Sequence, residues 1–434
     1  MVAWKTCLQK NFVLIFLGAL VSDIGNLFYS FAVSYWILDI TNNNAIIQGT
    51  YLGVCGITYL LFSLIGGVFS DRFNKAKLMY MCDYIKAILI ALSALLILFN
   101  NDNTTLNIII LFLIGIASNI IASVFSPASS SILPLILKQE QLQQAISYKS
   151  VLTSLQSIIG LCLAGMIYSL LPITSIFFII ALCYFLSAVS EMFIKYEHKT
   201  NENKLTLKTT FIDIKDGFNY IKTKKSLVSF LPIIIFINFF YAPISQNFIS
   251  YFIKTDIASN SNYLLHNIVS SEMWGALFSI SISITSVIFG IVLSTKKINK
   301  NSGKNIKKWL FIFGVLILSM AISYSLLVVN NNQLNTFLVI LIIIALLMGM
   351  ALSFINIHAN TIIQTITDLD KLGKVSSITS MVSHGLIPVA TFLAGFAITY
   401  LGSGSLLLIC SIGLLLVAIF ALCNNSFNNI ETNQ

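Results

Sequence analysis

Charged side chains are scarce in this chain: of its 434 residues only 9% are Asp, Glu, Lys or Arg, while 57% are hydrophobic. A soluble domain carries about 25% charged residues, so the composition excludes an ordinary water-soluble protein and predicts one that crosses a membrane many times. Arginine occurs once, at Arg72. Acidic residues are fewer than basic ones, which leaves a net charge of +9.

Motifs of catalysis and metal binding are also missing. The seven cysteines form no Cys-x-x-Cys pair, and most fall in apolar stretches, which is typical of small buried hydrophobic residues. No Walker A loop occurs, so ATP hydrolysis is not expected to drive the protein. Neither a Ser-His-Asp set nor a His-Glu-x-x-His motif is found. We therefore predict a protein that is not an enzyme and that needs no cofactor or metal.

Long apolar segments are abundant. A membrane-spanning helix needs about 20 mostly apolar residues, and twelve segments meet that requirement. The first of them is too long for the apolar region of a cleavable signal peptide. The predicted spans are 12–38, 45–69, 78–99, 106–133, 142–170, 173–194, 227–253, 272–294, 309–329, 335–360, 374–400 and 404–423.

Positive charge is distributed unevenly between the loops. Of the 25 basic residues, 23 fall on one alternating set of loops and tails or in the span ends next to them, whereas Lys254 lies on the other set and Lys86 lies deep inside a span. Because basic loops resist translocation, the first set is predicted to face the cytoplasm, together with both termini. Topology and contact with anionic lipid account for the net charge, so a nucleic-acid partner is not expected.

A long polar segment divides the predicted spans into six and six. We expect an N-terminal six-helix bundle over residues 1–194, a cytoplasmic linker over 195–226, and a C-terminal bundle with a short tail over 227–434. Apolar residues at helical spacing from Phe211 to Ile221 predict an amphipathic helix within the linker. The predicted fold is an all-α integral membrane protein whose two bundles are related by pseudo-two-fold symmetry.

One loop between spans carries a recognisable motif. It reads Gly67-Val-Phe-Ser-Asp71-Arg72-Phe-Asn74-Lys75-Ala-Lys77. This loop resembles the signature of the major facilitator superfamily, in which Gly-x-x-x-Asp-Arg-x-Gly-Arg precedes a further basic residue. Asn74 stands where glycine is usual, and asparagine also tolerates a left-handed backbone. The chain's only arginine falls in this loop, which indicates that its forked donors are needed there.

The resemblance implies a conformational latch at the inner face of the membrane. Its predicted members are Gly67, Asp71, Arg72, Lys75 and Asp83. Gly67 is expected to let two helices approach closely, as small residues do in membranes. Asp83 and Lys86 lie three residues apart on one helical face, which favours a local ion pair in which the lysine reaches toward the inner surface.

Further stretches are similar to the branch of the superfamily that contains macrolide-efflux and related drug exporters. They are Ser22 to Gly25 with Trp36 to Thr41, Phe125 to Pro134 with Gln141 to Ala145, and Gln364 with Lys371 to Val375. The resemblance implies a monomeric secondary transporter in the bacterial inner membrane. It would export a small amphipathic compound, a drug or a natural product, in exchange for protons by alternating access.

Two features of proton-driven exporters are missing. Leu161 follows Gly160 in the fifth span, where those exporters usually have proline, and the segment 106–134 carries no charge, where many relatives have an arginine. These departures keep two alternatives open. One is a symporter or facilitator for a small metabolite, and the other is a membrane sensor or partner-binding protein that transports nothing.

Asp23 is the best-placed ionisable residue. It lies 11 residues past Phe12, about 16 Å along a helix, which is near the middle of the bilayer. A carboxyl group there is costly and is a functional candidate for that reason. We predict that it alternates between protonated and charged forms and so couples proton entry to substrate release. The alternative is a structural carboxyl group bonded to a neighbouring helix.

Other polar residues at membrane depth complete the predicted site. The predicted proton-coupling and substrate residues are Asp23, Asn26, Tyr29, Asn238 and His384. Histidine has an unperturbed pKa of about 6.5, which suits proton handling. Glu191 and His358 fall near predicted inner helix ends and are expected to reach the interface. Glu272 is expected to begin the eighth span, where a carboxylate favours the helix N-terminus.

Overall fold

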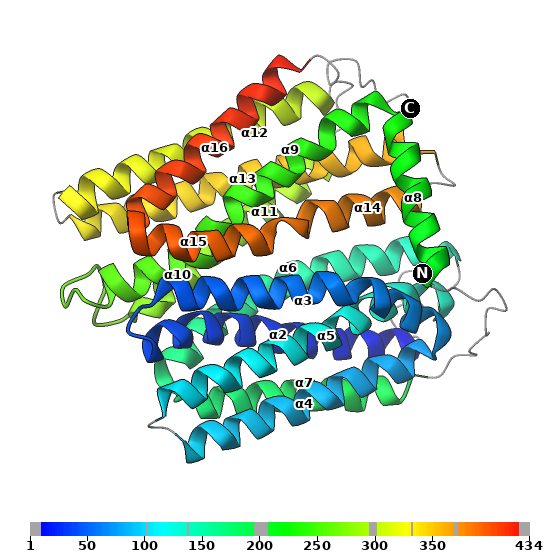
Figure 1. Ribbon diagram of the computed structural model, residues 1–434, viewed down its shortest axis with the longest axis horizontal. Coiled ribbons are helices and arrows are strands. Elements are labelled where there is room, and N and C mark those ends of the chain that lie inside the picture. Colours follow the sequence, from blue (N-terminus) through cyan, green and yellow to red (C-terminus); the bar gives the residue numbers. More distant parts are fainter. Residues whose placement is uncertain are drawn as a thin grey trace. The chain divides into compact units, whose positions relative to one another are not determined.

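The structure, a computed structural model, describes residues 10–100, 103–136, 139–194, 207–294, 302–330, 333–368 and 372–424 (Figure 1). Within these ranges the chain forms helices and no β-strand, so the predicted all-α fold is confirmed. The first set of helices is α2 (Lys10–Ile40), α3 (Ala45–Arg72), α4 (Lys75–Phe99), α5 (Thr104–Ile136), α6 (Gln139–Leu170), α7 (Ile173–Met192) and α8 (Leu207–Thr223).

The remaining helices include three π-helical segments, written η. They are α9 (Lys225–Ala242), η1 (Pro243–Phe248), α10 (Ile249–Phe252), η2 (Ile253–Ile257), α11 (Ser271–Ser294), α12 (Ser302–Ser323), η3 (Tyr324–Asn330), α13 (Leu334–Ile366), α14 (Leu372–Gly385), α15 (Ile387–Leu401) and α16 (Ser403–Cys423).

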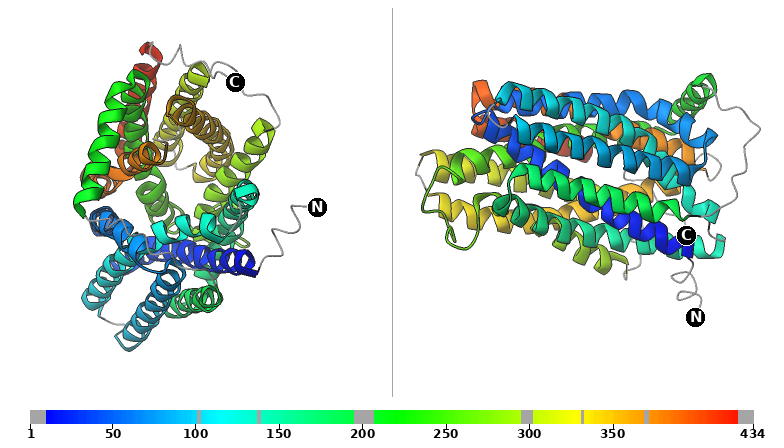
Figure 2. Two further views of the ribbon diagram at one scale, coloured as in Figure 1. Left: turned by 90° about the vertical axis from the view of Figure 1, so that its right-hand side faces the viewer. Right: turned by 90° about the horizontal axis from the view of Figure 1, so that it is seen from below.

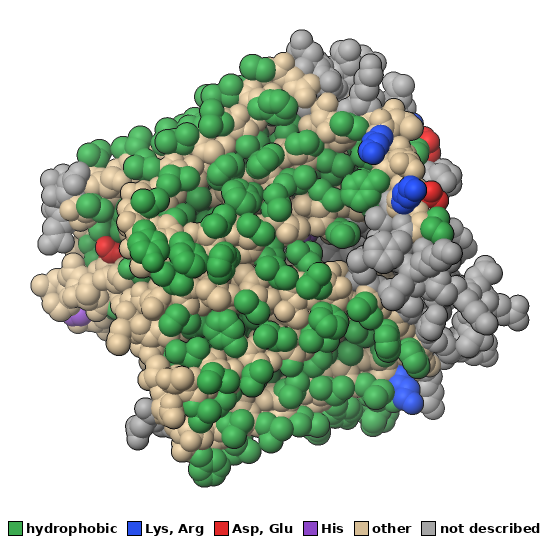
Figure 3. All heavy atoms as spheres, viewed as in Figure 1, with side chains coloured by type: hydrophobic (Ala, Val, Ile, Leu, Met, Phe, Trp, Pro, Cys, Tyr) green, Lys and Arg blue, Asp and Glu red, His purple; other side chains and the backbone are tan. Residues whose placement is uncertain are grey.

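Eleven helical stretches among the described residues are long and apolar enough to cross a membrane. The remaining predicted span, 142–170, falls in α6, where Leu155–Leu170 forms a shorter apolar helix. On the face drawn in Figure 3, hydrophobic side chains cover the middle stretches of the helices, and the visible Lys and Arg side chains lie toward the end near α8. In a helix the backbone N–H and C=O groups pair with one another, so they need no partner from the surrounding hydrocarbon, which offers none.

By its internal contacts the chain divides into two compact units. The first comprises Met1–Thr41 with Val54–Thr210, and the second comprises Asn42–Gly53 with Phe211–Gln434. The sequence did not predict that the first part of α3 packs with the second unit. Asn42 and Asn43 precede this part in the left-handed conformation, with φ of 52° and 61°, which asparagine tolerates better than most residues.

In the first unit, α7 is the central helix. Both α2 and α4 pack along it, α5 packs on α4, and α6 packs on α2; the left view of Figure 2 looks along these helices. Two serines of α7 donate to backbone carbonyls of α2: Ser187 Oγ to Gly18 at 3.0 Å and Ser190 Oγ to Leu14 at 2.8 Å. Such hydrogen bonds between helices hold them together where no hydrophobic driving force acts.

In the second unit, α13 packs against α11 and α12, and α16 packs against α12 and α9. A group of buried aromatic rings lies where the π-helical segments meet. Phe248 and Phe252 are stacked with centroids 5.8 Å apart, and the Tyr324 ring stands edge-on at 5.2 Å from Phe248. Edge-to-face rings at these distances contribute beyond their buried area.

Helices in the second unit are interrupted where the sequence predicted continuous spans. The predicted helix 227–253 contains η1, which begins at Pro243, a residue that cannot donate a helical hydrogen bond. The predicted helix 374–400 is broken after Gly385, and α15 begins with Pro388 in its first turn. Proline is accepted in a first turn because its missing N–H has no partner there.

Close helix contact in the first unit is made by Gly66, and the prediction for its neighbour Gly67 was wrong. A Cβ atom at position 66 would lie 2.1 Å from the Ser123 carbonyl oxygen on α5, whereas a Cβ at position 67 would meet no atom within 4 Å. The two glycines are adjacent and therefore point in different directions around α3, and only Gly66 faces α5.

These adjacent glycines form a matched pair for a stability test. Gly66→Ala should lower the stability of the purified protein by about 1–3 kcal/mol, because the methyl group collides with backbone that cannot yield. Gly67→Ala should leave stability unchanged or raise it by up to roughly 1 kcal/mol, the gain in helix propensity. Thermal unfolding in one detergent compares them. Equal losses for the two variants would contradict this assignment.

Candidate functional site

The predicted residues of α2 share one face of the helix. Asp23, Asn26 and Tyr29 are spaced by three residues, so they lie one above another. Asp23 and Tyr29 are half-buried and Asn26 is exposed. The Tyr184 hydroxyl of α7 donates to Asn26 Oδ1 at 2.6 Å. The structure thus brings together three of the five residues predicted for the proton-coupling and substrate site.

Three further ionisable residues are buried beside this face. Asp83 is 1% exposed, Lys86 4% and Glu191 0%. Asp23 lies close enough to act electrostatically on all three. We call Asp23, Asp83, Lys86 and Glu191 the inner charge cluster. Its members come from α2, α4 and α7, which pack against one another in the first unit.

Two expectations for this cluster were wrong. Lys86 does not reach toward the inner surface, because its Nζ lies over the Tyr184 ring, 5.0 Å from the centroid, where a cation is attracted by the ring face. Glu191 does not reach the interface, although it lies in the last turn of α7. Because α2 and α4 both cover α7, that turn is enclosed, which a single helix sequence could not reveal.

The predicted latch loop is described in part. Asn74 caps α4 by accepting the Lys77 N–H at 3.1 Å, and its φ of −59° shows no left-handed backbone. This residue therefore serves as a helix cap, a role that asparagine fills well. Lys75 Nζ donates to the Ser70 carbonyl at 2.8 Å. The side chains of Asp71 and Arg72 lie outside the described residues, and Asp83 faces the inner charge cluster.

The other predicted site residues belong to the second unit. Asn238 Nδ2 donates to the Ile234 carbonyl of its own helix at 3.1 Å, and His384 is exposed in the last turn of α14. His358 was expected at the interface but is 6% exposed. Its Nδ1 lies 2.8 Å from the Phe354 carbonyl, an acceptor, so Nδ1 carries the proton and Nε2 can accept from Asn305 Nδ2 at 3.3 Å.

A second polar group lies at the predicted outer end of the second unit. Lys254 Nζ pairs with Glu272 Oε1 at 2.7 Å, and both side chains are nearly buried, at 8% and 13% exposure. Glu272 lies in the first turn of α11 as predicted. The Tyr324 hydroxyl lies 2.8 Å from Ser403 Oγ and 3.4 Å from both carboxylate oxygens of Asp256.

Beside this group is a small polar cavity of about 380 Å³. It is lined by Thr255, Asp256, Ser259, Asn260, Ser261, Val328 and Leu334. Most of the lining side chains carry hydroxyl, amide or carboxylate groups, which suits water and small polar molecules better than an apolar compound.

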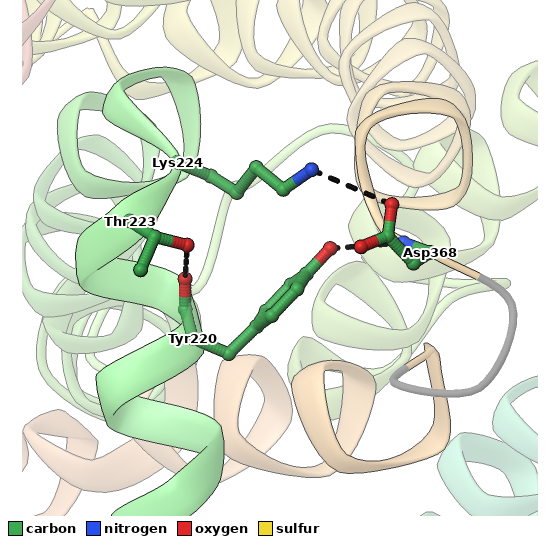
Figure 4. A network of polar contacts seen from close by, with 4 residues as sticks. All are labelled: Tyr220, Thr223, Lys224 and Asp368. Atoms are coloured by element: carbon green, nitrogen blue, oxygen red, sulfur yellow. Dashed lines mark hydrogen bonds and ion pairs between the residues drawn. The ribbon is translucent and has the colours of Figure 1, made fainter.

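At the opposite, predicted inner end, the linker helix is tied to the second unit (Figure 4). Lys224 Nζ lies 3.4 Å from Asp368 Oδ1, and the Asp368 backbone N–H donates to the Tyr220 hydroxyl at 3.0 Å. Within the predicted linker the chain forms α8, and these contacts join the C-terminal end of α8 to Asp368, two residues after the end of α13. The negative potential of Tyr220, followed by that of Asp368, raises the pKa of Lys224.

Apolar helices long enough to span a bilayer, arranged in two compact units with ionisable side chains buried inside the first, define a polytopic helical membrane protein of the transporter class. The sequence profile of the Major Facilitator Superfamily matches residues 15–387. The chain therefore belongs to this family of transporters.

Known proteins of this family resemble the chain over nearly its whole length. The uncharacterized MFS-type transporter YvqJ of Bacillus subtilis is 23% identical, over 95% of this chain and 92% of that protein. Macrolide efflux protein A of Streptococcus pyogenes is 21% identical, over 97% and 96%. Among solved structures, the nucleoside transporter NupG superposes with a TM-score of 0.70 at 11% identity, covering 95% of this chain and 98% of that one, and shares its fold.

The nearly buried ion pair of the second unit yields a stability prediction. Lys254→Met and Glu272→Gln should each lower the free energy of unfolding by about 3 kcal/mol or more, because each leaves one group of the pair without its partner. The double variant should lie closer to the wild type than the sum of the two losses. Chemical unfolding of the wild type, the two single variants and the double variant measures this double-mutant cycle. Additive losses would show that the two residues do not interact.

Proposed function

We propose that this transporter exports a small amphipathic compound in exchange for protons by alternating access. The observation that carries the proposal is Asp23, a half-buried carboxyl group far inside a membrane-spanning helix, on a face that it shares with Asn26 and Tyr29. A carboxyl group in that setting can exchange its charge for a proton, which is what coupling requires. The partners are protons, the substrate and the bilayer.

The direction of transport is supported by relatedness. Macrolide efflux protein A, which aligns with the chain from end to end, is an efflux protein by name. The ring-rich surroundings of α2 add support, because Phe31, Tyr35 and Tyr168 pack with centroids 4.6 to 6.2 Å apart. Aromatic surfaces suit bulky amphipathic or cationic molecules. A bacterial inner membrane, with both termini in the cytoplasm, is the location that the basic loops favour.

A second candidate function is favoured by a specific observation. Leu161 replaces the proline expected in α6, and α5 carries no charged residue. Gly160 beside it packs against α2, where an added Cβ would lie 2.7 Å from Leu27 Cδ1. A symporter or a facilitator for a small metabolite needs neither missing feature. Transport that follows the substrate gradient alone would favour this function.

Transport in proteoliposomes tests the proposal. Uptake of erythromycin and of a panel of amphipathic dyes is measured with and without an imposed pH gradient, for the wild type and for Asp23→Asn. We expect the gradient to drive uptake by the wild type, and Asp23→Asn to transport at the rate seen without a gradient. The reason is that the amide introduced by Asp23→Asn, unlike the carboxyl group of Asp23, does not take up or release a proton under the conditions of the assay.

Asp39→Asn is the matched control. Asp39 lies on the same helix at its outer end, is exposed, and accepts a hydrogen bond from the Tyr168 hydroxyl at 2.6 Å. Its replacement should leave gradient-driven uptake intact. If Asp23→Asn still transports in a gradient-dependent way, the assignment of coupling to Asp23 is wrong.

A further inference from the structure

The inner charge cluster contains more acid groups than its basic group can balance. Among the described residues, the cluster holds three carboxyl groups, those of Asp23, Asp83 and Glu191, but one ammonium group, that of Lys86, on which only Asp23 and Asp83 of the three act electrostatically. All four lie in membrane-spanning helices. An uncompensated charge in such surroundings costs several kcal/mol, so the surplus carboxyl groups are expected to hold protons.

The groups of the cluster are ordered along α7. Lys86 lies over the Tyr184 ring, and Glu191 follows Tyr184 by about two helical turns toward the inner end. Asp83 and Asp23 each act electrostatically on both Lys86 and Glu191. The ammonium group is thus placed at one end of the cluster and Glu191 at the other.

Glu191 is the least compensated member. Its side chain is 0% exposed, and neither Oε1 nor Oε2 has a hydrogen-bond partner among the described residues. The side chain lies against α2, where a Cβ at Gly18 would be 3.0 Å from its Cγ and 3.4 Å from its Oε1. The hydroxyl of Ser187, one turn away, is used by the Gly18 carbonyl. A carboxylate here would lack both a counter-ion and donors, whereas a carboxylic acid is neutral.

Other titratable groups face this site from two helices. On α4 they are Cys82 and Asp83, and on α2 it is Asp23, whereas Lys86 of α4 lies over the Tyr184 ring at the other end of the cluster. Asp83 Oδ2 is also buried without a hydrogen-bond partner among the described residues. The two carboxyl groups with unsatisfied oxygens, Asp83 and Glu191, are therefore neighbours across the α4–α7 contact.

We propose that Glu191, with Asp83 beside it, forms a second proton-binding site in the first unit, separate from the Asp23 position. In the conformation described, the proton is bound to a carboxyl oxygen of Glu191. Release transfers this proton to water that enters at the inner end of α7 and leaves a carboxylate at Glu191. The part of this site in coupling rests on the proposed function, whereas its protonation does not.

Infrared spectroscopy of the full-length protein in lipid nanodiscs tests the protonation directly. We expect the wild-type spectrum minus the Glu191→Gln spectrum to contain the carbonyl stretch of a protonated carboxyl group, and this band to weaken as the pH is raised. The absence of the band at every pH would overturn the proposal.

One control keeps the result interpretable. Isotope-labelled glutamate in the wild type should shift the band, which assigns it to a glutamate without a substitution and so without any effect on folding. An unshifted band would assign the proton to an aspartate and overturn the role of Glu191.

Transport measurements separate this proposal from the proposed function. If Glu191 is protonated and Glu191→Gln also loses gradient-driven uptake of erythromycin while it keeps exchange without a gradient, the site takes part in coupling. If the wild type moves no member of the panel, the proposed function fails, but the infrared band still decides whether Glu191 binds a proton.

Discussion

Charge inside a membrane is costly unless it is matched by an opposite charge or a proton, and in this transporter the buried ionisable residues of the first unit gather around α7. That helix is enclosed by α2 and α4, so its ionisable residue Glu191 cannot reach water as its position near a helix end would suggest. The packing that encloses it depends on short-range contacts: Ser187 and Ser190 donate to carbonyls of α2, and Gly18 leaves room for the glutamate side chain. The same few residues therefore set both the helix packing and the surroundings of the Glu191 carboxyl group.

Much of the fold could be predicted from the sequence because the bilayer imposes a strong and simple pattern. Apolar segments of sufficient length and the one-sided distribution of lysine define the spans, and the helices begin and end close to the predicted residues. The interruptions of the helices were harder to predict. The interruption after Gly385 and the π-helical segment at Pro243 depend on how neighbouring helices satisfy freed backbone groups, and a hydropathy pattern carries no information on that.

The candidate site, like the fold, could be predicted from the sequence only in part. The intramembrane positions of Asp23, Asp83 and Lys86 are visible in the sequence because charge is so rare there, but their assembly into one cluster is a tertiary property. Glu191 was assigned to the interface because its distance from the helix end is short, and only the packing of α2 and α4 overrides this. For Gly66 and Gly67 the motif drew attention to the second residue, whereas rotation about the helix axis decides which of the two meets α5.

The first part of α3 has a consequence for how the chain passes between the two units. α3 is one uninterrupted helix, yet Asn42–Gly53 packs with the second unit and the rest with the first. Gly49 and Gly395 of α15 meet there without side chains between them, since a Cβ at Gly395 would lie 3.2 Å from Gly49 Cα. α3 therefore carries the chain from the second unit into the first without a loop or a break. The packing of its first part depends on the absence of side chains at Gly49 and Gly395, so a side chain at either position would push α3 away from α15 within the second unit.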